Sequence, residues 1–371
     1  MPYAFLTLEE ALRDLPTLRG VLGQRWIDRE SNTPPLESAF PLARTLRIKE
    51  LSHLHATLDR RLAELWNVTG ADDWRNRLRS DGQGFRELQT ELAFADFLQQ
   101  RGYDFEHPEK GPDFAIVLGD EPPLMVEATT PRIVMWDDDL DTRLWILSRQ
   151  YGYSVRTEPL TEDMPILNED VTERKVQQIV ADAVALLSSA TEVGSVLVQT
   201  YPYPDIGLSI EWTQSANPRG SGRNAPVSSH GRAFNYVSTA AERKVKQLKT
   251  VDAHTLLIGT NQLPLSDWGP YVRSVRHRVP FYGDFDWTQI HPQIDRIILF
   301  EATYGDNRVP AVDVVMRPSA SADVSVGLSR FLEELRLGGE DYRRQSEEDE
   351  HKLVTELMEY EARKRQAQVH S

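Results

Sequence analysis

Three acidic residues within the first 130 positions have the surroundings of metal ligands. Glu91 lies on the apolar stripe of an expected helix, Asp113 follows Gly-Pro at the start of an apolar run, and Glu127 ends a second apolar run. A buried carboxylate is costly unless it is paired or coordinates a cation. If the three side chains converge, a hard divalent ion is their simplest compensation, and Mg²⁺ (or Mn²⁺) suits oxygen ligands and can also meet a substrate phosphate.

Each of these residues also has an ordinary interpretation. Asp113 could be a turn aspartate after proline, Glu127 a solvent-facing residue on an alternating strand, and Glu91 a surface residue one position away from the stripe. The three occur together in the expected structural context, and this joint occurrence favours a functional site.

The segments that must position these side chains are a helix and a set of short strands. The stretch 84–100 has helical periodicity and is followed by Gly102, a plausible stop. Three extended segments come next: "YDFEHP", "DFAIVL" and "LMVEAT". The sequence therefore predicts a helix followed by antiparallel strands.

The stretch 91–131, "ELAFADFLQQRGYDFEHPEKGPDFAIVLGDEPPLMVEATTP", resembles the core of the PD-(D/E)XK, or restriction-endonuclease-like, nuclease superfamily. That core runs helix, three-stranded meander, helix, strand. Glu91 matches the helical glutamate, Pro112-Asp113 the Pro-Asp pair, and Glu127-Ala128 the first two positions of the last motif. Thr129 stands where the superfamily has lysine.

The resemblance implies a role for each matching residue. Asp113 and Glu127 would hold the metal with the backbone carbonyl of Ala128, and Glu91 would bind a second metal or orient water. The implied activity is metal-dependent phosphodiester hydrolysis of nucleic acid, with DNA preferred. Because threonine cannot supply the charge of the motif lysine, the alternative is an inactive nuclease-fold module that binds nucleic acid or a protein partner.

Some members of the superfamily place the lysine on the helix after the core strands. In "AERKVKQL", residues 241–248, Lys244 lies beside the inward stripe of the expected helix, with Lys246 as second choice. The similar "TERKVQQI", residues 172–179, makes Lys175 a rival. The strand "HTLLIGT" follows the first of these closely and favours Lys244, although "GSVLVQT" also follows the other.

Composition limits the other classes of function. The chain lacks cysteine, which excludes thiolate chemistry, and has no apolar run long enough for a membrane span, so a cytoplasmic protein is expected. Its net charge of −15 argues against a general grip on nucleic acid. Residues 214–280 nevertheless hold ten Lys/Arg against three acids. Within this stretch Arg273, Arg276 and Arg278 are candidate phosphate contacts. Nucleic acid is the expected partner, and homo-oligomerisation is left open.

The pattern along the chain predicts an α/β protein with a mixed central sheet flanked by helices. We expect an N-terminal helical region (1–80), a nuclease-like core in two parts (81–131 and 232–320), an inserted β-α-β-β subdomain (132–231) and a charged helical tail (321–371).

Two further motifs have ordinary interpretations. The histidines of "HLH", residues 53–55, are two positions apart and point to different helix faces, which predicts surface histidines. The acidic stretch "WDDDLD", residues 136–141, lacks the glycine and terminal glutamate of a calcium loop and is expected to be a solvated turn.

Overall fold

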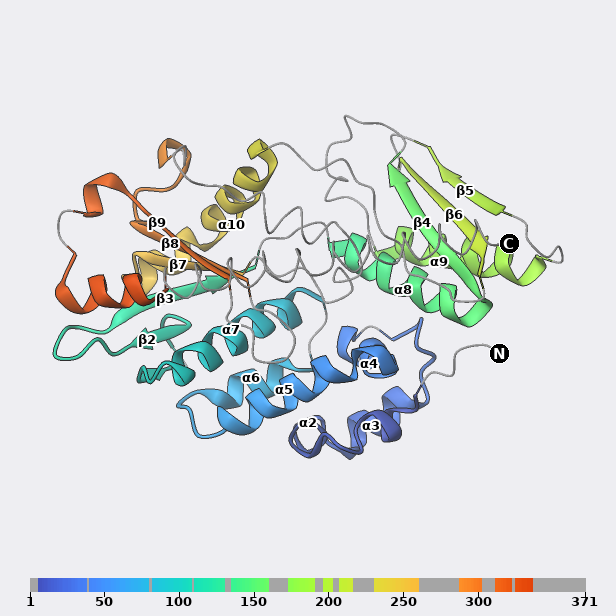
Figure 1. Ribbon diagram of the computed structural model, residues 1–371, viewed down its shortest axis with the longest axis horizontal. Coiled ribbons are helices and arrows are strands. Elements are labelled where there is room, and N and C mark those ends of the chain that lie inside the picture. Colours follow the sequence, from blue (N-terminus) through green and yellow to red (C-terminus); the bar gives the residue numbers. More distant parts are fainter. Residues whose placement is uncertain are drawn as a thin grey trace, which may run out of the picture.

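The structure is a computed structural model of the 371-residue chain. The residues that it describes are 6–38, 40–79, 82–108, 110–130, 135–159, 173–190, 196–202, 207–215, 230–259, 287–301, 311–321 and 324–335. They form a mixed α/β structure with two sheets, each flanked by helices (Figure 1).

The larger sheet has six strands in the order β1-β2-β3-β7-β8-β9. Strands β1 (Phe105–Glu106), β2 (Phe114–Ile116) and β3 (Leu124–Thr129) form an antiparallel meander. Strands β7 (Thr255–Gly259) and β8 (Arg296–Glu301) run parallel to β3, and β9 (Ala311–Met316) closes the sheet in the antiparallel sense. The prediction of a mixed central sheet is confirmed.

The two faces of this sheet contact different helices. Side chains alternate along a strand, and Val126 and Ala128 of β3 pack into the core that includes α7 (Gly82–Gln100). Met125 packs into the core on the other face, against α10 (His230–Thr250). Figure 1 shows the two helices on opposite sides of the sheet. By this alternation Glu127 and Thr129 belong to the α10 face.

Helix α7 confirms the prediction for 84–100 and begins two residues earlier. It ends before Gly102, whose φ of 75° is accessible to glycine at low cost. Its inner side carries Phe94, which makes edge-to-face contacts with Phe114 of β2 and Phe300 of β8, at ring distances of 5.2 and 5.3 Å. These contacts hold α7 against the sheet.

Six helices precede α7 and pack beneath it in the same core: α1 (Leu8–Ala11), α2 (Pro16–Leu22), α3 (Gln24–Ser31), α4 (Pro41–Leu46), α5 (Ser52–Glu64) and α6 (Ala71–Arg77). Within the expected N-terminal helical region, residues 41–64 are divided between α4, the short 3-10 turn η1 (Lys49–Leu51) and α5. Arg47 stands at the break. Its guanidinium donates to the carbonyl of Glu30, and its own carbonyl accepts from the Leu6 N–H. The backbone leaves the helical region at the next residue, Ile48, whose φ and ψ are −94° and 105°.

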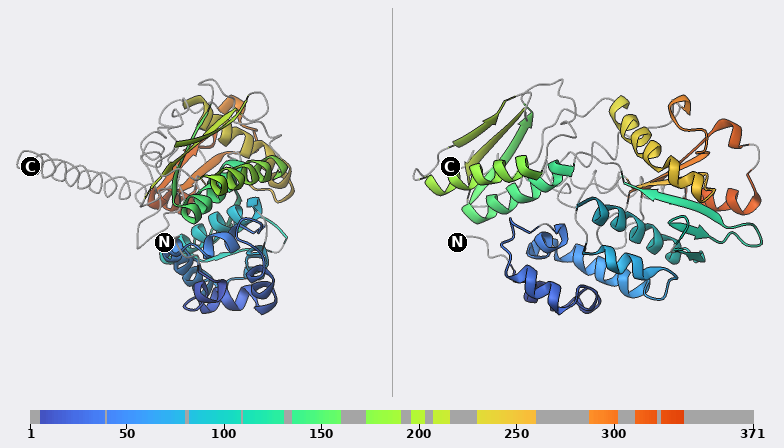
Figure 2. Two further views of the ribbon diagram at one scale, coloured as in Figure 1. Left: turned by 90° about the vertical axis from the view of Figure 1, so that its right-hand side faces the viewer. Right: turned by 180° about the vertical axis from the view of Figure 1, so that it is seen from behind.

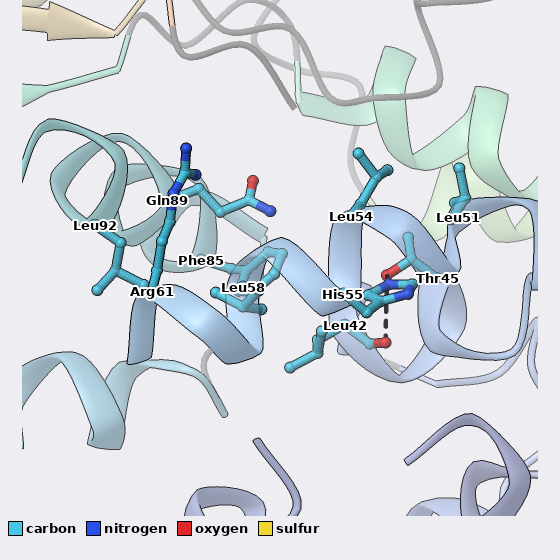
Figure 3. A pocket seen from close by; sticks show the side chains of 10 residues that line it. All are labelled: Leu42, Thr45, Leu51, Leu54, His55, Leu58, Arg61, Phe85, Gln89 and Leu92. Atoms are coloured by element: carbon cyan, nitrogen blue, oxygen red, sulfur yellow. Dashed lines mark hydrogen bonds between the residues drawn. The ribbon is translucent and has the colours of Figure 1, made fainter. Parts of the chain in front are cut away.

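The prediction of two surface histidines at 53–55 is wrong for His55. Its ring is buried, lines a cavity of about 30 Å³ and lies beside Thr45, with 3.2 Å between Nε2 and the threonine Oγ1 (Figure 3). Burial, with a smaller contribution from the charge of His53, lowers the pKa of His55 to about 3. The stripe of α5 is wide enough to include position 55, which spacing alone did not reveal.

His55 should make the protein sensitive to acid. Because its pKa is depressed in the folded state, the unfolded chain binds the extra proton first, and stability is lost as the pH falls from about 6.5 towards 3. Between about pH 7 and pH 5, wild type should lose about 2 kcal/mol relative to His55→Gln, which offers a donor near Nε2 but does not titrate. Urea unfolding at both pH values measures this, and a constant difference between the two proteins would contradict it.

The second sheet has its own core. Strands β4 (Tyr153–Pro159), β5 (Val196–Tyr201) and β6 (Leu208–Gln214) are antiparallel in the order β4-β6-β5. Helices α8 (Met135–Tyr151) and α9 (Glu173–Ser189) cover one face of it, and Leu144, Ile179 and Trp212 are buried between them. Trp145 and Ile146 of α8 pack against Leu51 and Leu54, so this part also contacts the N-terminal helices.

The acidic stretch 136–141 lies in the first turns of α8, so the expectation of a turn is wrong there. No glycine or proline interrupts 135–151, and aspartates near a helix N-terminus interact favourably with the helix dipole. The segment between the two parts of the core therefore forms α8, β4, α9, β5 and β6, with one more helix than the expected β-α-β-β order.

Residues 326–335 are helical and bury Leu328, Phe331 and Leu332 in the core beneath the central sheet. The remainder of the expected tail, 336–371, lies outside the described residues. Among the helices that the structure describes, none has the length and apolar character to cross a membrane. Figure 2 shows the second sheet and the central sheet at opposite ends of the molecule's long axis.

Candidate metal centre

Asp113 and Glu127 come together through the β2–β3 hairpin. Phe114 pairs with Val126, so continuing the register by one residue sets Asp113 opposite Glu127, and directly opposite residues point to the same face of a sheet. The carboxylate of Asp113 accepts a hydrogen bond of 2.7 Å from the Ala128 N–H. The N–H and C=O of one strand residue point to the same neighbouring strand, so the Ala128 carbonyl also faces the β2 side.

The carboxylate of Glu127 is fully buried, and only one of its two oxygens is near a cation. Its Oε1 has no hydrogen-bond partner among the described residues. Burial, and then the charge of Asp113, raise the pKa of Glu127 to about 8, against the opposing effect of Lys244. Glu127 Oε1 therefore lacks the hydrogen bond or cation that a buried carboxylate oxygen needs. The donor set of Asp113, Glu127 and the Ala128 carbonyl fits a hard divalent cation.

Lys244 of α10 reaches this pair of carboxylates. Its Nζ lies 3.5 Å from Glu127 Oε2 and 3.8 Å from Asp113 Oδ2, and it donates to Gln247 Oε1 at 3.1 Å. The lysine side chain is 18% exposed, so it is largely buried. Thr129 lies on the same face of β3 as Glu127, so Lys244 approaches the side of the sheet where a motif lysine at 129 would point.

Lys246 and Lys175, the two other candidates for the site lysine, do not lie beside Asp113 and Glu127. Lys246 is exposed on α10, and two residues along a helix rotate its direction by about 200° relative to Lys244. Lys175 lies on α9, whose Val176 and Ile179 pack into the core of the second sheet. Figures 1 and 2 show α9 at the far end of the molecule from β3.

Glu91 is buried beside this centre but is already compensated. Its carboxylate accepts hydrogen bonds from both terminal nitrogens of Arg77, at 2.7 and 2.9 Å, and from the indole N–H of Trp74, at 3.1 Å. Burial and the charge of Asp113 raise the pKa of Glu91, and Arg77 opposes them. These hydrogen bonds join Glu91 of α7 to α6, which carries both Arg77 and Trp74. The metal-binding role that the resemblance implies for it stays a prediction.

His107 was not identified from the sequence. One ligand atom from each of Glu91, His107 and Asp113 lies within 4.8 Å of the others. The imidazole is buried, stacks on Trp74 at 4.6 Å, and its Nδ1 lies 2.6 Å from the backbone carbonyl of Asp113. The sequence feature that could have identified it is a histidine near the end of the extended segment "YDFEHP".

The arginines predicted to contact phosphates, Arg273, Arg276 and Arg278, lie outside the described residues. Comparison of the chain with protein-family models, with curated proteins and with solved structures gives no match. The resemblance to a nuclease superfamily therefore stays a hypothesis that depends on the residues and geometry described above.

The buried carboxylate of Glu127 should impose a pH dependence on the metal-free protein. Because its pKa is raised in the folded state, the native protein holds the proton that the unfolded chain releases above about pH 4.5, and stability falls as the pH rises towards 8. In EDTA, wild type should lose stability relative to Glu127→Gln by up to about 1.4 kcal/mol per pH unit in this window. Urea unfolding of both proteins from about pH 5 to pH 8 measures how the difference in their free energy of unfolding changes with pH. A difference that changes in the opposite direction would contradict the prediction.

The pair of Arg77 and Glu91 should matter for folding. Arg77→Met leaves a buried carboxylate without its cation and should cost roughly 3 kcal/mol in the free energy of unfolding. Adding Glu91→Gln to that variant removes the unpaired charge and should restore about half of the loss. Chemical denaturation of wild type, both single variants and the double variant gives the coupling between the residues. A coupling energy near zero would show that the paired hydrogen bonds between Arg77 and Glu91 contribute nothing to the free energy of unfolding.

Proposed function

We propose that this protein hydrolyses phosphodiester bonds of nucleic acid, with DNA as the preferred substrate, at the centre made by Asp113, Glu127 and Lys244. The observation that carries the proposal is the position of the Lys244 ammonium, 3.5 and 3.8 Å from two carboxylates that face each other across a hairpin. Two carboxylates and one cation beside them form the set that the superfamily motif supplies when its lysine is present.

The order of elements supports a restriction-endonuclease-like core. Helix α7, the meander β1–β3, helix α10 and strand β7 follow one another in the sequence of elements that the superfamily core has, once the segment between β3 and α10 is set aside. Strand β7 pairs in parallel with β3, which brings the end of α10 back to the carboxylates.

Asp113, Glu127 and the Ala128 carbonyl are the groups that would hold Mg²⁺ or Mn²⁺. Such an ion lowers the pKa of coordinated water and offsets the charge that develops on a phosphate under attack. The unpartnered Glu127 Oε1 is the group that gains most from a cation. Deprotonation of Glu127 is needed for this role, so binding should strengthen as the pH rises towards 8.

Lys244 takes the part that Thr129 cannot. In hydrolysis, water attacks phosphorus, one phosphorus–oxygen ester bond breaks, and the leaving oxygen takes a proton. An ammonium held beside both carboxylates stabilises the negative charge of that transition state and orients the attacking water. Gln247 accepts a hydrogen bond from Lys244 and limits its rotation.

The exposed side of α10 supports a nucleic-acid substrate. Arg243, Lys246 and Lys249 are all exposed and recur every three residues, which sets them along one side of the helix. Arg243 also donates to the Thr130 carbonyl at 3.2 Å, just past the end of β3. Cations along this line could bind the phosphates that flank the one being cleaved.

The activity test is Mn²⁺- or Mg²⁺-dependent cleavage of linear and circular DNA by the purified full-length chain. Glu127→Ala should abolish cleavage, because it removes the buried ligand oxygens. Lys244→Ala should lower kcat by roughly 10²-fold, the usual effect of losing one stabilising group, while Mn²⁺ still binds. Lys175→Ala is the matched control, a lysine on α9, which packs into the core of the second sheet, and should leave kcat nearly unchanged.

Three results would contradict the proposal. Equal losses in Lys244→Ala and Lys175→Ala would remove Lys244 from the site. Undiminished cleavage by a repurified Glu127→Ala protein would assign the activity to a contaminant. Carboxylate-dependent Mn²⁺ binding by wild type without cleavage of DNA or RNA would instead indicate a nuclease-fold module that binds without chemistry.

A further inference from the structure

His107 is the buried polar residue next to the candidate centre that the proposed reaction does not use. It follows β1, and its ring lies on the α7 face with Trp74 and Phe114. Its Nδ1 is 2.6 Å from the carbonyl oxygen of Asp113. A carbonyl only accepts hydrogen bonds, so Nδ1 must carry a proton and donate it.

The backbone explains why a side chain makes this bond. Val117 N–H donates to the Asp104 carbonyl at 2.9 Å, and Glu106 pairs with Ala115, so hydrogen-bonded pairs recur every second residue along β1 and β2. The next such pair would set residue 108 opposite Asp113. Residue 108 is proline and has no N–H to donate. The imidazole of His107 supplies the missing donor to the Asp113 carbonyl.

Four other contacts hold His107 in place, two through its ring and two through its backbone. The ring stacks on Trp74, and the backbone N–H of His107 donates to the Thr69 carbonyl at 3.1 Å. Gly70 passes so close to the His107 carbonyl that a Cβ there would lie 1.7 Å from its oxygen. On its far side, Nε2 lies 3.5 Å from Asp73 Oδ2 of α6. The donor is therefore rigid.

We propose that His107 is a positioning residue, which fixes the metal-binding pose of Asp113 by donating to its backbone carbonyl. The inference rests on the proposed function of Asp113 as a metal ligand. Asp113 is held at two points: its carbonyl by His107 and its carboxylate by the Ala128 N–H. Loss of the first contact leaves the start of β2 free to rotate, which moves the carboxylate away from Glu127.

Two variants of His107 separate this role from packing. In His107→Asn the side-chain amide nitrogen occupies the place of Nδ1 and can still donate to Asp113, whereas in His107→Gln it lies near the place of Nε2 and cannot. Both variants lose the ring and its stacking on Trp74. They differ by one methylene and in the hydrogen bond to Asp113, so the contrast between them separates that bond from the loss of ring packing.

The first readout is the Mn²⁺ affinity of the full-length protein, measured by calorimetry with Glu127→Ala as the reference for loss of the site. His107→Asn should bind within about threefold of wild type, and His107→Gln should bind roughly 10- to 100-fold more weakly, the usual range for a partner that orients a metal ligand. Equal affinities in the two variants would overturn the positioning role.

The second readout does not depend on the metal. The amide of Ala128 reports its hydrogen bond to the Asp113 carboxylate, and its resonance in ¹⁵N-alanine-labelled protein can be assigned from the signal lost in Ala128→Ser. It should stay in place in His107→Asn and shift in His107→Gln. If wild type binds no Mn²⁺, the proposed function fails, and this resonance still decides whether His107 positions Asp113. An Ala128 resonance that does not shift in His107→Gln would refute the positioning role of His107.

Discussion

Buried negative charge is the constraint on which the arrangement of this protein depends. Glu91, Asp113 and Glu127 lie at one end of the β2–β3 hairpin, two of them without access to solvent. Each uncompensated charge would cost several kcal/mol, so each carboxylate either keeps a proton or is met by a cation. Arg77 of α6 meets Glu91, and Lys244 of α10 meets Glu127 and Asp113. The charges therefore bind together elements that are far apart in the chain.

The alternation of β3 separates packing from chemistry. Val126 and Ala128 fill the core beneath the sheet, and the residues between them face α10. A lysine placed on α10 and a lysine at position 129 of the strand would point into the same space from opposite sides. This explains physically how a cation can lie beside the carboxylates although residue 129 of β3, buried and paired with Ile258 of β7, is a threonine.

The parts of the fold that depend on local pattern could be predicted from the sequence. Helical periodicity located α7, and the two apolar runs around a turn located β2 and β3. The hairpin register then makes Asp113 and Glu127 neighbours. The choice between Lys244 and Lys175 could not be made with certainty, because both helices have nearly the same sequence and a following strand. What separates them is the parallel pairing of β7 with β3, a long-range contact.

Contacts that depend on packing between distant segments escaped prediction. Arg77 and His107 reach the centre because α6 lies against α7 and β1, and no spacing in the sequence encodes that approach. His55 was expected at the surface because a short motif does not report the width of a buried helix face. The acidic stretch 136–141 was expected in a turn, although its charges suit the start of a helix.

Lys244 and Glu127 are 117 positions apart in the chain. The whole of the second sheet is synthesised between them, and β7, which pairs with β3, follows α10. A nascent chain that has already folded its hairpin therefore has both carboxylates but no lysine beside them. The centre is completed only when α10 and β7 have left the ribosome, so a partly synthesised chain carries the two carboxylates without the lysine that lies beside them in the folded protein.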